Sequence, residues 1–243
     1  MPGIYTRQQM AAVIDHAVLK PIQTDKDVLD NCRMCDENAV FSICVRPSDV
    51  RLAAHALKNS QTKVSMVVGF PHGANAPSTK AAEARQGLLD GAVELDMVWN
   101  IGKFLSGDAN WARRDIEAVV AEARNFKDVK VKVILETCWL NDEQLVQACR
   151  IAQAAGADFV KTSTGFGEGP ATPHVIDIMV KTVGQTMGVK ASAGIRSYET
   201  AAGYLDQGCT RLGVASTLAV LDGADAAAKG QQGKGDAAKG GSY

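Results

Sequence analysis

The stretch DFVKTSTGFGEGPATPHVIDIMVKTVGQTMGVKASAG, residues 158 to 194, contains two short runs of strand character, each with a lysine inside it. The runs are DFVKTSTG (158–165) and GVKASAG (188–194), and the segment between them has helical periodicity. This order predicts two parallel strands joined by a helical crossover. It also raises the question of why Lys161 and Lys190 lie there, because a buried ammonium group costs free energy unless it is paired, hydrated or deprotonated.

The same strand and helix unit recurs along the whole chain. Six further runs have strand character: IDHAVL (14–19), FSICV (41–45), KVSMVVGF (63–70), AVELDMVW (92–99), VKVILET (131–137) and RLGVAS (211–216). Eight units predict an α/β fold, a closed (β/α)8 TIM barrel. An open doubly wound sheet is the alternative, but its common sign, G-x-G-x-x-G after the first strand, is missing.

The segments between these runs carry signals for helix ends. Ser78, Asn141 and Ser197 precede helix-like stretches and are plausible N-caps. The glycines that close such stretches are Gly91, Gly156 and Gly208.

Composition favours a globular protein with a sizeable core. The chain has 243 residues, of which 46% are hydrophobic and 22% charged, and we expect a barrel domain over residues 1–225. Residues 226–243 are rich in glycine, alanine and lysine and are expected to form a flexible tail. A net charge of −1 supplies no basic field for nucleic acid, so no nucleic-acid partner is expected. We see no secretory signal and no apolar run of transmembrane length, so we expect a cytoplasmic protein without a membrane partner.

The cysteines and histidines give little support for a metal centre. Cys32 and Cys35 form a C-x-x-C in a predicted helix, but no second pair stands at ligand spacing, so we interpret the cysteines as reduced and partly buried thiols. His16 and His72 lie beside strand ends and are interpreted as packing histidines, whereas His55 and His174 fall in helix-like segments. We expect no metal and no cofactor.

Alternation along the strands predicts that charged side chains meet inside the barrel. Lys161 shares a side of its strand with Phe159 and Ser163, and Lys190 shares one with Ser192. Asp96 alternates in the same way with apolar neighbours. If the apolar sides face the helices, then Lys161, Lys190 and Asp96 all point into the barrel.

Such a cluster has a chemical use. Two ammonium groups on adjacent strands repel each other, and this repulsion favours the neutral amine that condenses with a carbonyl carbon to form a Schiff base. A nearby carboxylate can move the protons. The alternative is a structural salt bridge between Asp96 and one lysine; two lysines and a carboxylate near strand ends favour chemistry.

The loops after the last strands are candidates for phosphate binding. Gly194, Ser216 and Thr217 follow strands seven and eight, where backbone N–H groups and a helix N-terminus bind phosphate in many barrels, and Gly165 and Gly167 follow strand six. Any one of these glycines can instead serve only to make a turn.

Longer motifs make the interpretation more specific. IDHAVLKP, VGFPHG, ELDMVWNIG, KVILET, FVKTSTGF and VKASAGIR, which span nearly all of the chain up to residue 220, closely resemble the deoxyribose-phosphate aldolase family. The resemblance implies a class I aldolase on a TIM barrel. It further implies reversible joining of acetaldehyde and glyceraldehyde 3-phosphate to 2-deoxyribose 5-phosphate, without a cofactor.

The resemblance also implies roles for individual residues. The Schiff-base lysine corresponds to Lys161, the lysine that perturbs it to Lys190, and the proton-transfer aspartate to Asp96. Asp15 corresponds to an acidic residue of the proton relay and Cys44 to a substrate-lining position. The remaining substrate-binding positions, mainly in the phosphate loops, are Thr164, Gly165, Gly194, Ser216 and Thr217. Some relatives end in tyrosine, which implies that Tyr243 can enter the site and assist proton transfer.

Two residues depart from the family pattern, and two other functions stay open. Ala193 and Ala17 stand where the family commonly has glycine and threonine, which affects substrate affinity more than reaction type. The alternatives are an aldolase for a different phosphorylated sugar or aldehyde acceptor, and a sugar-phosphate-binding barrel that has lost turnover. We expect small sugar phosphates and aldehydes as substrates and a homo-oligomer, a dimer or larger.

Overall fold

The computed structural model describes residues 3–231, in which eight parallel strands close into one barrel. Each strand pairs with its neighbours in the sequence, and β8 pairs with β1 to close the ring. The strands are β1 (Ile14–Val18), β2 (Ser42–Val45), β3 (Lys63–Val68), β4 (Glu94–Val98), β5 (Lys130–Ile134), β6 (Phe159–Lys161), β7 (Gly188–Ser192) and β8 (Arg211–Val214). The predicted TIM barrel and all eight strand runs are confirmed.

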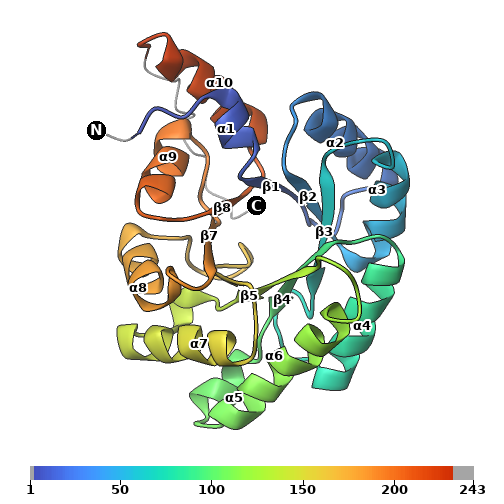
Figure 1. The fold of residues 1–243 in the computed structure, drawn as a ribbon, viewed down its shortest axis with the longest axis vertical. Helices are drawn as coiled ribbons and strands as arrows, with labels where there is room; N and C mark the ends of the chain where they lie inside the picture. The colour runs from blue at the N-terminus through green and yellow to red at the C-terminus, as the bar shows by residue number, and fades with distance from the viewer. Residues whose placement is uncertain (1–2, 232–243) are drawn as a thin grey trace.

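Helices surround the barrel as an outer ring (Figure 1). They are α1 (Arg7–Ala11), α2 (Asp25–Glu37), α3 (Val50–Ala56), α4 (Pro77–Leu89), α5 (Ile101–Leu105), α6 (Ala109–Ala123), α7 (Asp142–Ala154), α8 (Pro173–Val183), α9 (Tyr198–Asp206) and α10 (Thr217–Ala228), with 3-10 turns η1 (Pro47–Asp49) and η2 (Thr137–Trp139). Helix α1 lies against α10, so the beginning of the described chain packs on its last helix (Figure 1). The expected tail begins inside α10, and most of it, including Tyr243, lies outside the described residues.

Helix ends follow the predicted signals at all but one position. Asn141 caps α7 by accepting a hydrogen bond of 2.9 Å from the backbone N–H of Gln144, and Ser197 caps α9. The prediction for Ser78 is wrong, because the N-cap of α4 is Ala76, two residues earlier, and the helix begins at Pro77. Proline has a fixed φ suited to the first helical position and lacks only an N–H that would have no partner there. The three predicted closing glycines all adopt positive φ, as the left-handed cap requires.

The apolar sides of the strands face the helices, as the alternation predicts. Leu95, Val133, Val160, Ala191 and Leu212 are completely or almost completely buried and belong to the hydrophobic core between barrel and helices. The opposite sides of these strands carry buried charged residues, which are described below. The core therefore lies outside the sheet, and the barrel interior is left for polar chemistry.

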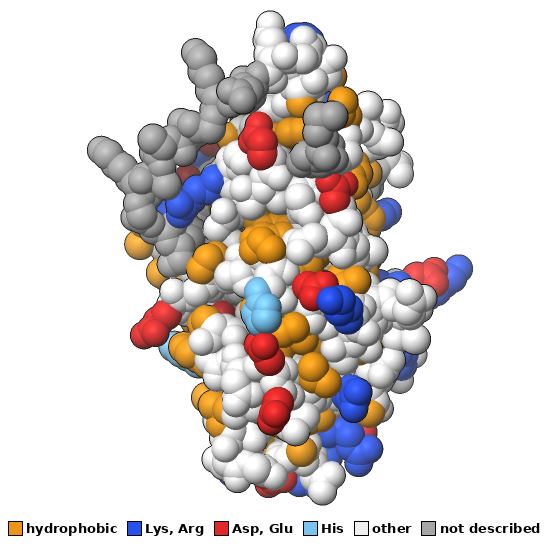
Figure 2. Space-filling model, turned by 90° about the vertical axis from the view of Figure 1, so that its left-hand side faces the viewer, with side chains coloured by type: hydrophobic (Ala, Val, Ile, Leu, Met, Phe, Trp, Pro, Cys, Tyr) orange, Lys and Arg blue, Asp and Glu red, His pale blue; other side chains and the backbone are white. Residues whose placement is uncertain are grey.

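The surface is mixed in charge. On the face shown in Figure 2, acidic and basic side chains are interspersed with apolar ones wherever the surface is not drawn in grey. This agrees with the net charge of −1. Within residues 3–231, none of the helices is both long enough and apolar enough to cross a membrane.

Two helical glycines provide a test of how tightly the helices pack on the barrel. A Cβ added to Gly87 in α4 would lie 1.7 Å from the sulfur of Met66 on β3, whereas one added to Gly203 in α9 would meet no atom within 4 Å. We therefore expect Gly87→Ala to destabilise the protein by about 1–2 kcal/mol, because overpacking outweighs the helical preference of alanine. Gly203→Ala should instead stabilise it by about 0.5–1 kcal/mol. Urea unfolding of both variants measures the two signs, and equal effects would contradict this packing.

Candidate active site

The barrel interior brings together the three charged residues that alternation predicts. Lys161 Nζ lies 2.8 Å from Asp96 Oδ2, and Lys190 Nζ lies 2.7 Å from the same oxygen. All three side chains are at least 98% buried. Lys161 and Lys190 are register partners on β6 and β7, so their amines approach one carboxylate from adjacent strands.

Asp15 on β1 joins this group, as the resemblance implies. Its Oδ2 lies 2.5 Å from Lys190 Nζ, and its Oδ1 accepts a hydrogen bond of 2.6 Å from the Ser42 hydroxyl on β2. Gly213 on β8 leaves room for this arrangement, since a Cβ there would lie 3.2 Å from Lys190 Cε. Asp15 thus holds Lys190 on the side opposite to Asp96.

A third interior lysine, Lys132 on β5, was missed by the sequence interpretation. Its Nζ lies 2.6 Å from Asp96 Oδ1, 2.6 Å from Glu94 Oε2 and 3.5 Å from Asp15 Oδ2. The signal was present, because Lys132 alternates with apolar residues in VKVILET as Lys161 does in its own strand. Applying the same rule to strand five would have found it.

These residues form one connected set of charges, here called the interior charge cluster. Its members are Asp15, Glu94, Asp96, Lys132, Lys161, Lys190 and Arg211. Burial would raise the pKa of Asp96, but the charges of Lys132, Lys161 and Lys190 outweigh burial and hold that pKa well below its usual value. Asp15 behaves alike, because Lys132, Lys190 and Arg211 outweigh burial and lower its pKa. Both carboxylates are therefore ionised at neutral pH.

Lys132 and Lys161 differ in how many carboxylates hold them. Burial would lower the pKa of Lys132, but Asp15, Asp96 and Glu94 outweigh burial and raise that pKa, so this lysine stays charged. Among the described residues, only Asp96 lies within ion-pair distance of Lys161, and Asp96 is shared with the other two lysines. Lys161 is thus the least compensated lysine of the three.

A small apolar wall stands beside the lysines at the C-terminal ends of the strands. Cys44 is 2% exposed and clusters with Leu19 and Val67, with Ala17 and Phe70 packed against them. Burial raises the pKa of the Cys44 thiol, which stays protonated. Phe70 also meets Phe166 edge to face, with ring centroids 5.3 Å apart, so loops after β3 and β6 touch.

Glu136, which the sequence interpretation did not select, holds the loop that follows Lys161. It has a φ of 52° and is 1% exposed, and its carboxylate accepts hydrogen bonds from both the backbone N–H and the hydroxyl of Thr164. Thr164 in turn accepts a bond of 3.0 Å from the N–H of Phe166. Gly167 lies so close that a Cβ would be 2.9 Å from the Glu136 carboxyl carbon. Burial raises the pKa of Glu136.

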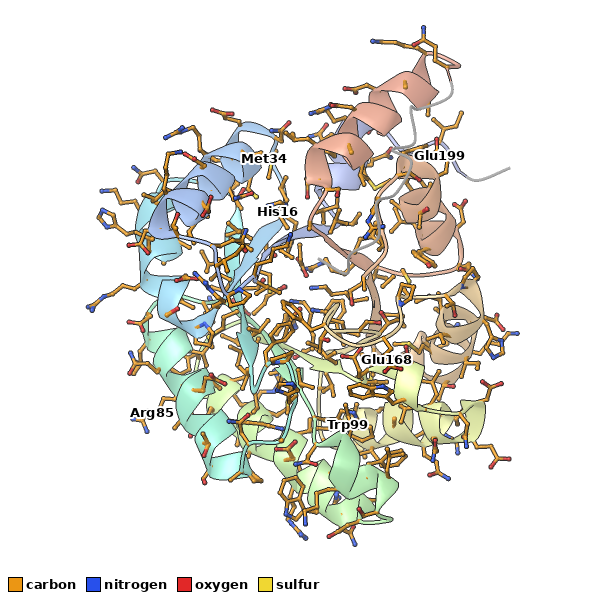
Figure 3. All side chains as sticks on the ribbon, turned by 180° about the vertical axis from the view of Figure 1, so that it is seen from behind. His16, Met34, Arg85, Trp99, Glu168 and Glu199 are labelled. Atoms are coloured by element: carbon orange, nitrogen blue, oxygen red, sulfur yellow. The ribbon has the colours of Figure 1, made fainter. Side chains whose placement is uncertain are left out.

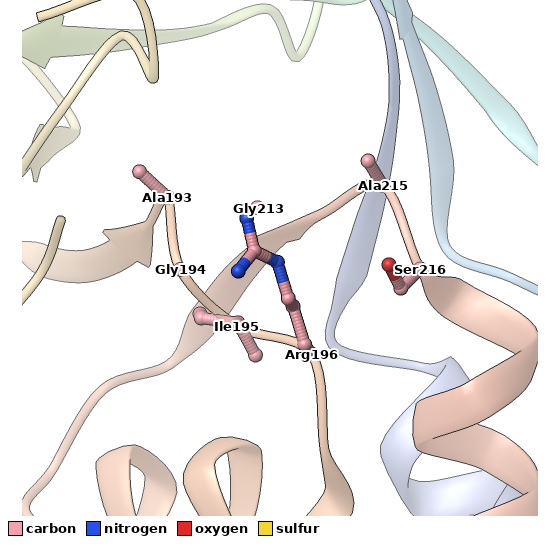
Figure 4. A pocket seen from close by; sticks show the side chains of 7 residues that line it. All are labelled: Ala193, Gly194, Ile195, Arg196, Gly213, Ala215 and Ser216. Carbon is pink, nitrogen blue, oxygen red and sulfur yellow. The ribbon is translucent and has the colours of Figure 1, made fainter. Parts of the chain in front are cut away.

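A cleft between the loops after β7 and β8 contains two of the predicted phosphate residues. Its lining includes Gly194, Gly213 and Ser216, together with Arg196. In Figure 4 the Arg196 side chain extends across the cleft, and the Ser216 hydroxyl faces it. Arg196 belongs to the quoted motif VKASAGIR, but the sequence alone gave no direction for its side chain.

The backbone of the loops after β6 and β7 adopts left-handed conformations at three positions. Gly194 has a φ of 76°, Gly165 a φ of 83°, and Ala193 a φ of 67°. Alanine at positive φ carries a local cost of about 1 kcal/mol, which the glycine common in the family does not. Ala193 thus departs from the family at the position where glycine has a physical reason.

The hydroxyl of Thr217 contacts a buried histidine. Thr217 opens the twelve-residue helix α10, and its Oγ1 lies 2.8 Å from His16 Nδ1. His16 Nε2 contacts Asn31 Oδ1 at 2.6 Å, so the ring joins α10 to α2. Figure 3 shows His16 between these helices. The predicted packing role of His16 is confirmed, whereas His72 is an exposed residue of the loop after β3.

The remaining histidines lie in helices and the cysteines are free thiols, as the sequence analysis interpreted them. His55 and His174 lie in α3 and α8, and Cys32 and Cys35 lie buried in α2. All six cysteines are free. Across residues 3–231, no three His, Cys, Asp or Glu side chains are grouped so that they could hold a metal ion.

Comparison with known proteins identifies the family. A family model described as "DeoC/LacD family aldolase" matches residues 9–220. The chain belongs to this family. As an aldolase it is a lyase that makes and breaks carbon–carbon bonds, and the interior charge cluster is its candidate active site.

Named relatives of this aldolase agree with that assignment. A deoxyribose-phosphate aldolase of Thermococcus gammatolerans is 47% identical over 217 residues, covering 88% of this chain and 96% of the relative. One of Clostridium perfringens is 47% identical over 218 residues, covering 89% and 96%. A solved deoxyribose phosphate aldolase of Aeropyrum pernix, described as tetrameric, has a TM-score of 0.85 and 30% identity, covering 91% of this chain and 93% of that chain.

Burial of His16 predicts a specific pH dependence of stability. Burial lowers the pKa of His16 to about 4, from about 6.5 in an unfolded chain. Below about pH 6.5 the unfolded chain binds a proton that the folded protein does not bind until about pH 4, so His16 should remove roughly 3 kcal/mol of stability across this window. Urea unfolding of the aldolase and of His16→Gln between pH 7 and pH 4 measures this. The variant should show the flatter dependence, and parallel curves would contradict the prediction.

Proposed function

We propose that this aldolase reversibly cleaves 2-deoxy-D-ribose 5-phosphate to acetaldehyde and D-glyceraldehyde 3-phosphate, in deoxyribonucleotide catabolism. The observation that carries the proposal is the position of Lys161, whose amine shares one carboxylate oxygen with Lys190 inside a closed barrel. Membership of the aldolase family and the names of its relatives support the reaction.

In the direction of synthesis, the neutral amine of Lys161 attacks the carbonyl carbon of acetaldehyde to give a carbinolamine. Loss of water gives an iminium ion, and loss of a methyl proton gives an enamine. The enamine carbon then attacks the aldehyde carbon of glyceraldehyde 3-phosphate, and water releases the product from Lys161.

Asp96, Lys190 and Asp15 are proposed to handle the protons of these steps. Asp96 is ionised and lies 2.8 Å from the reacting amine, so it can accept a proton from the carbinolamine and return it to the leaving hydroxyl. Lys190 bridges Asp96 and Asp15 at 2.7 and 2.5 Å, which provides a path for a proton between β4 and β1. Its charge also disfavours a second ammonium group at Lys161.

The walls of the site suit the two substrates. Cys44, as a protonated thiol among apolar neighbours, is proposed to line the space for the methyl group of acetaldehyde. Thr164, held by Glu136, is proposed to fix the loop that faces the acceptor. The phosphate is proposed to bind in the cleft lined by Gly194, Arg196 and Ser216, with backbone donors of Gly165 and of the N-terminus of α10 at Thr217.

Three further features are proposals that rest on expectation and relatedness. A homo-oligomer, a dimer or larger, is supported by the tetramer described for the Aeropyrum pernix relative. The chemistry needs only small substrates of the cell interior, so we propose a cytoplasmic location. Tyr243 is proposed to assist proton transfer at the enamine carbon, and it lies outside the described residues.

The covalent step has a direct test. Acetaldehyde and sodium borohydride should label Lys161, because reduction of a Schiff base leaves a stable secondary amine that mass spectrometry can locate. Lys161→Leu should abolish this label, whereas Lys63→Leu, which replaces an exposed lysine of β3, should not. Labelling that persists at another lysine in Lys161→Leu would overturn the assignment.

Phosphate recognition has a separate test. Ser216→Asp places a negative charge in the cleft, so it should raise KM for deoxyribose 5-phosphate about tenfold or more while changing turnover of unphosphorylated deoxyribose little. The matched control is Ser78→Asp, which adds the same charge in the first turn of α4 at an exposed position. Equal losses for both substrates would show that phosphate does not bind in this cleft and would favour an unphosphorylated acceptor.

A further inference from the structure

Arg211 closes the floor of the barrel and is a member of the interior charge cluster to which neither sequence nor family assigned a role. It is the first residue of β8 and is 8% exposed. Its guanidinium carbon lies 3.7 Å from the ring centroid of Phe41 and 5.4 Å from that of Phe159. The charge is therefore stacked on an aromatic ring and held away from water.

Two carboxylates hold this guanidinium, one from β1 and one from β4. Arg211 Nη1 lies 2.8 Å from Asp15 Oδ1 on β1 and 2.8 Å from Glu94 Oε2 on β4, and Nη2 lies 3.3 Å from Glu94 Oε1. Burial would lower the pKa of Arg211, but Asp15 and Glu94 outweigh burial and raise it. Arg211 is thus a fixed positive charge at every pH at which the protein works.

Because of this fixed charge, the interior charge cluster has a net charge of +1 when all its members are ionised. In the described chain the cluster contains four bases and three carboxylates, so its fully ionised form carries one excess positive charge. Arginine cannot release a proton to relieve the excess, whereas a lysine can. Without Arg211, three charged lysines would neutralise three ionised carboxylates, and no lysine would need to lose a proton.

The contacts indicate which lysine has the fewest carboxylate partners. Lys132 lies within ion-pair distance of three carboxylates and Lys190 of two, whereas among the described residues only Asp96 lies that close to Lys161. The path from the floor to the reacting amine runs through Asp15, Lys190 and Asp96, with contacts of 2.8, 2.5, 2.7 and 2.8 Å. Lys161 is therefore the lysine at which the excess positive charge is least compensated.

Two other titratable groups act near the upper end of this path. The charge of Lys161 is felt by Glu136, from the loop after β5. Cys44 on β2 is also close, and it is a neutral thiol. Within the described residues, the hydrogen bonds of the Arg211 side chain go to Asp15 and Glu94, not to either of these groups.

We propose that Arg211 is a positioning residue whose permanent charge, acting through Asp15, Lys190 and Asp96, favours the neutral amine of Lys161. The proposal rests on the function given above, in which Lys161 forms the Schiff base. It assigns the arginine of the floor a part in chemistry that takes place at the opposite end of the barrel. A purely structural arginine would instead affect folding and leave the pH profile in place.

The test changes the charge of the floor in both directions. Arg211→Met removes one positive charge at similar length, and Glu94→Gln removes one negative charge from the same ion pair. The measurement is the pH dependence of trapping of acetaldehyde at Lys161 by cyanoborohydride, located by mass spectrometry and compared with the unchanged protein under identical conditions. The profile should move by about one pH unit to higher pH in Arg211→Met and to lower pH in Glu94→Gln.

Arg211→Lys is the matched control, because it keeps the charge and loses the planar guanidinium that stacks on Phe41. Its profile should stay in place even if its rate falls. Lower rates in Arg211→Met and Glu94→Gln without opposite displacements would overturn the proposal. If Arg211→Met does not fold, Glu94→Gln decides alone, and an unmoved profile rejects the proposal. Absence of any trapping at Lys161 in the unchanged protein would instead reject the proposed function.

Discussion

The carboxylate of Asp96 is the contact on which the interior of this barrel depends. Its two oxygens accept hydrogen bonds from the side-chain amines of Lys132, Lys161 and Lys190, which come from three successive strands, β5, β6 and β7. Removing such a charge from water costs several kcal/mol, and the cost is offset only when partners are close and well oriented. The ion pairs of the cluster therefore form only when the strands are held in the correct register, and pairing in the closed sheet sets that register. The same close and well-oriented contacts are needed for stability and for the proposed chemistry.

The division of the chain between strands and loops follows from that demand. Strand side chains have fixed directions, so the groups that carry charge and covalent chemistry lie on strands. Loop residues such as Gly194 and Ser216 line the cleft in which phosphate is proposed to bind. Glu136 joins the two parts, because it leaves β5 at positive φ and binds Thr164 in the loop after β6. The end of β5 and the loop after β6 are thus held together by one buried carboxylate.

Period-two alternation was sufficient to predict the inward direction of Lys161, Lys190 and Asp96, because strand geometry fixes side-chain direction without knowledge of neighbours. Lys132 followed the same rule and was accessible to it. Arg196 and Glu136 were not, since both lie beyond strand ends, where side-chain direction depends on loop dihedral angles that no periodic pattern encodes. The error at Ser78 has a similar origin, because the preference of Pro77 for the first helical position outweighed the preference of serine for the cap.

The order in which the interior charges occur along the chain has a consequence for biosynthesis. Asp15 is made early, on β1, whereas its partners Lys190 and Arg211 lie on β7 and β8. A chain emerging from the ribosome therefore carries a carboxylate on its first strand that gains Lys132 as a partner only with β5, and Lys190 and Arg211 only with the last two strands. Sealing the first strands into a dry interior before that point would leave the charge buried without partners. The barrel is thus expected to close only after translation of β8, and its early strands are expected to stay hydrated until then.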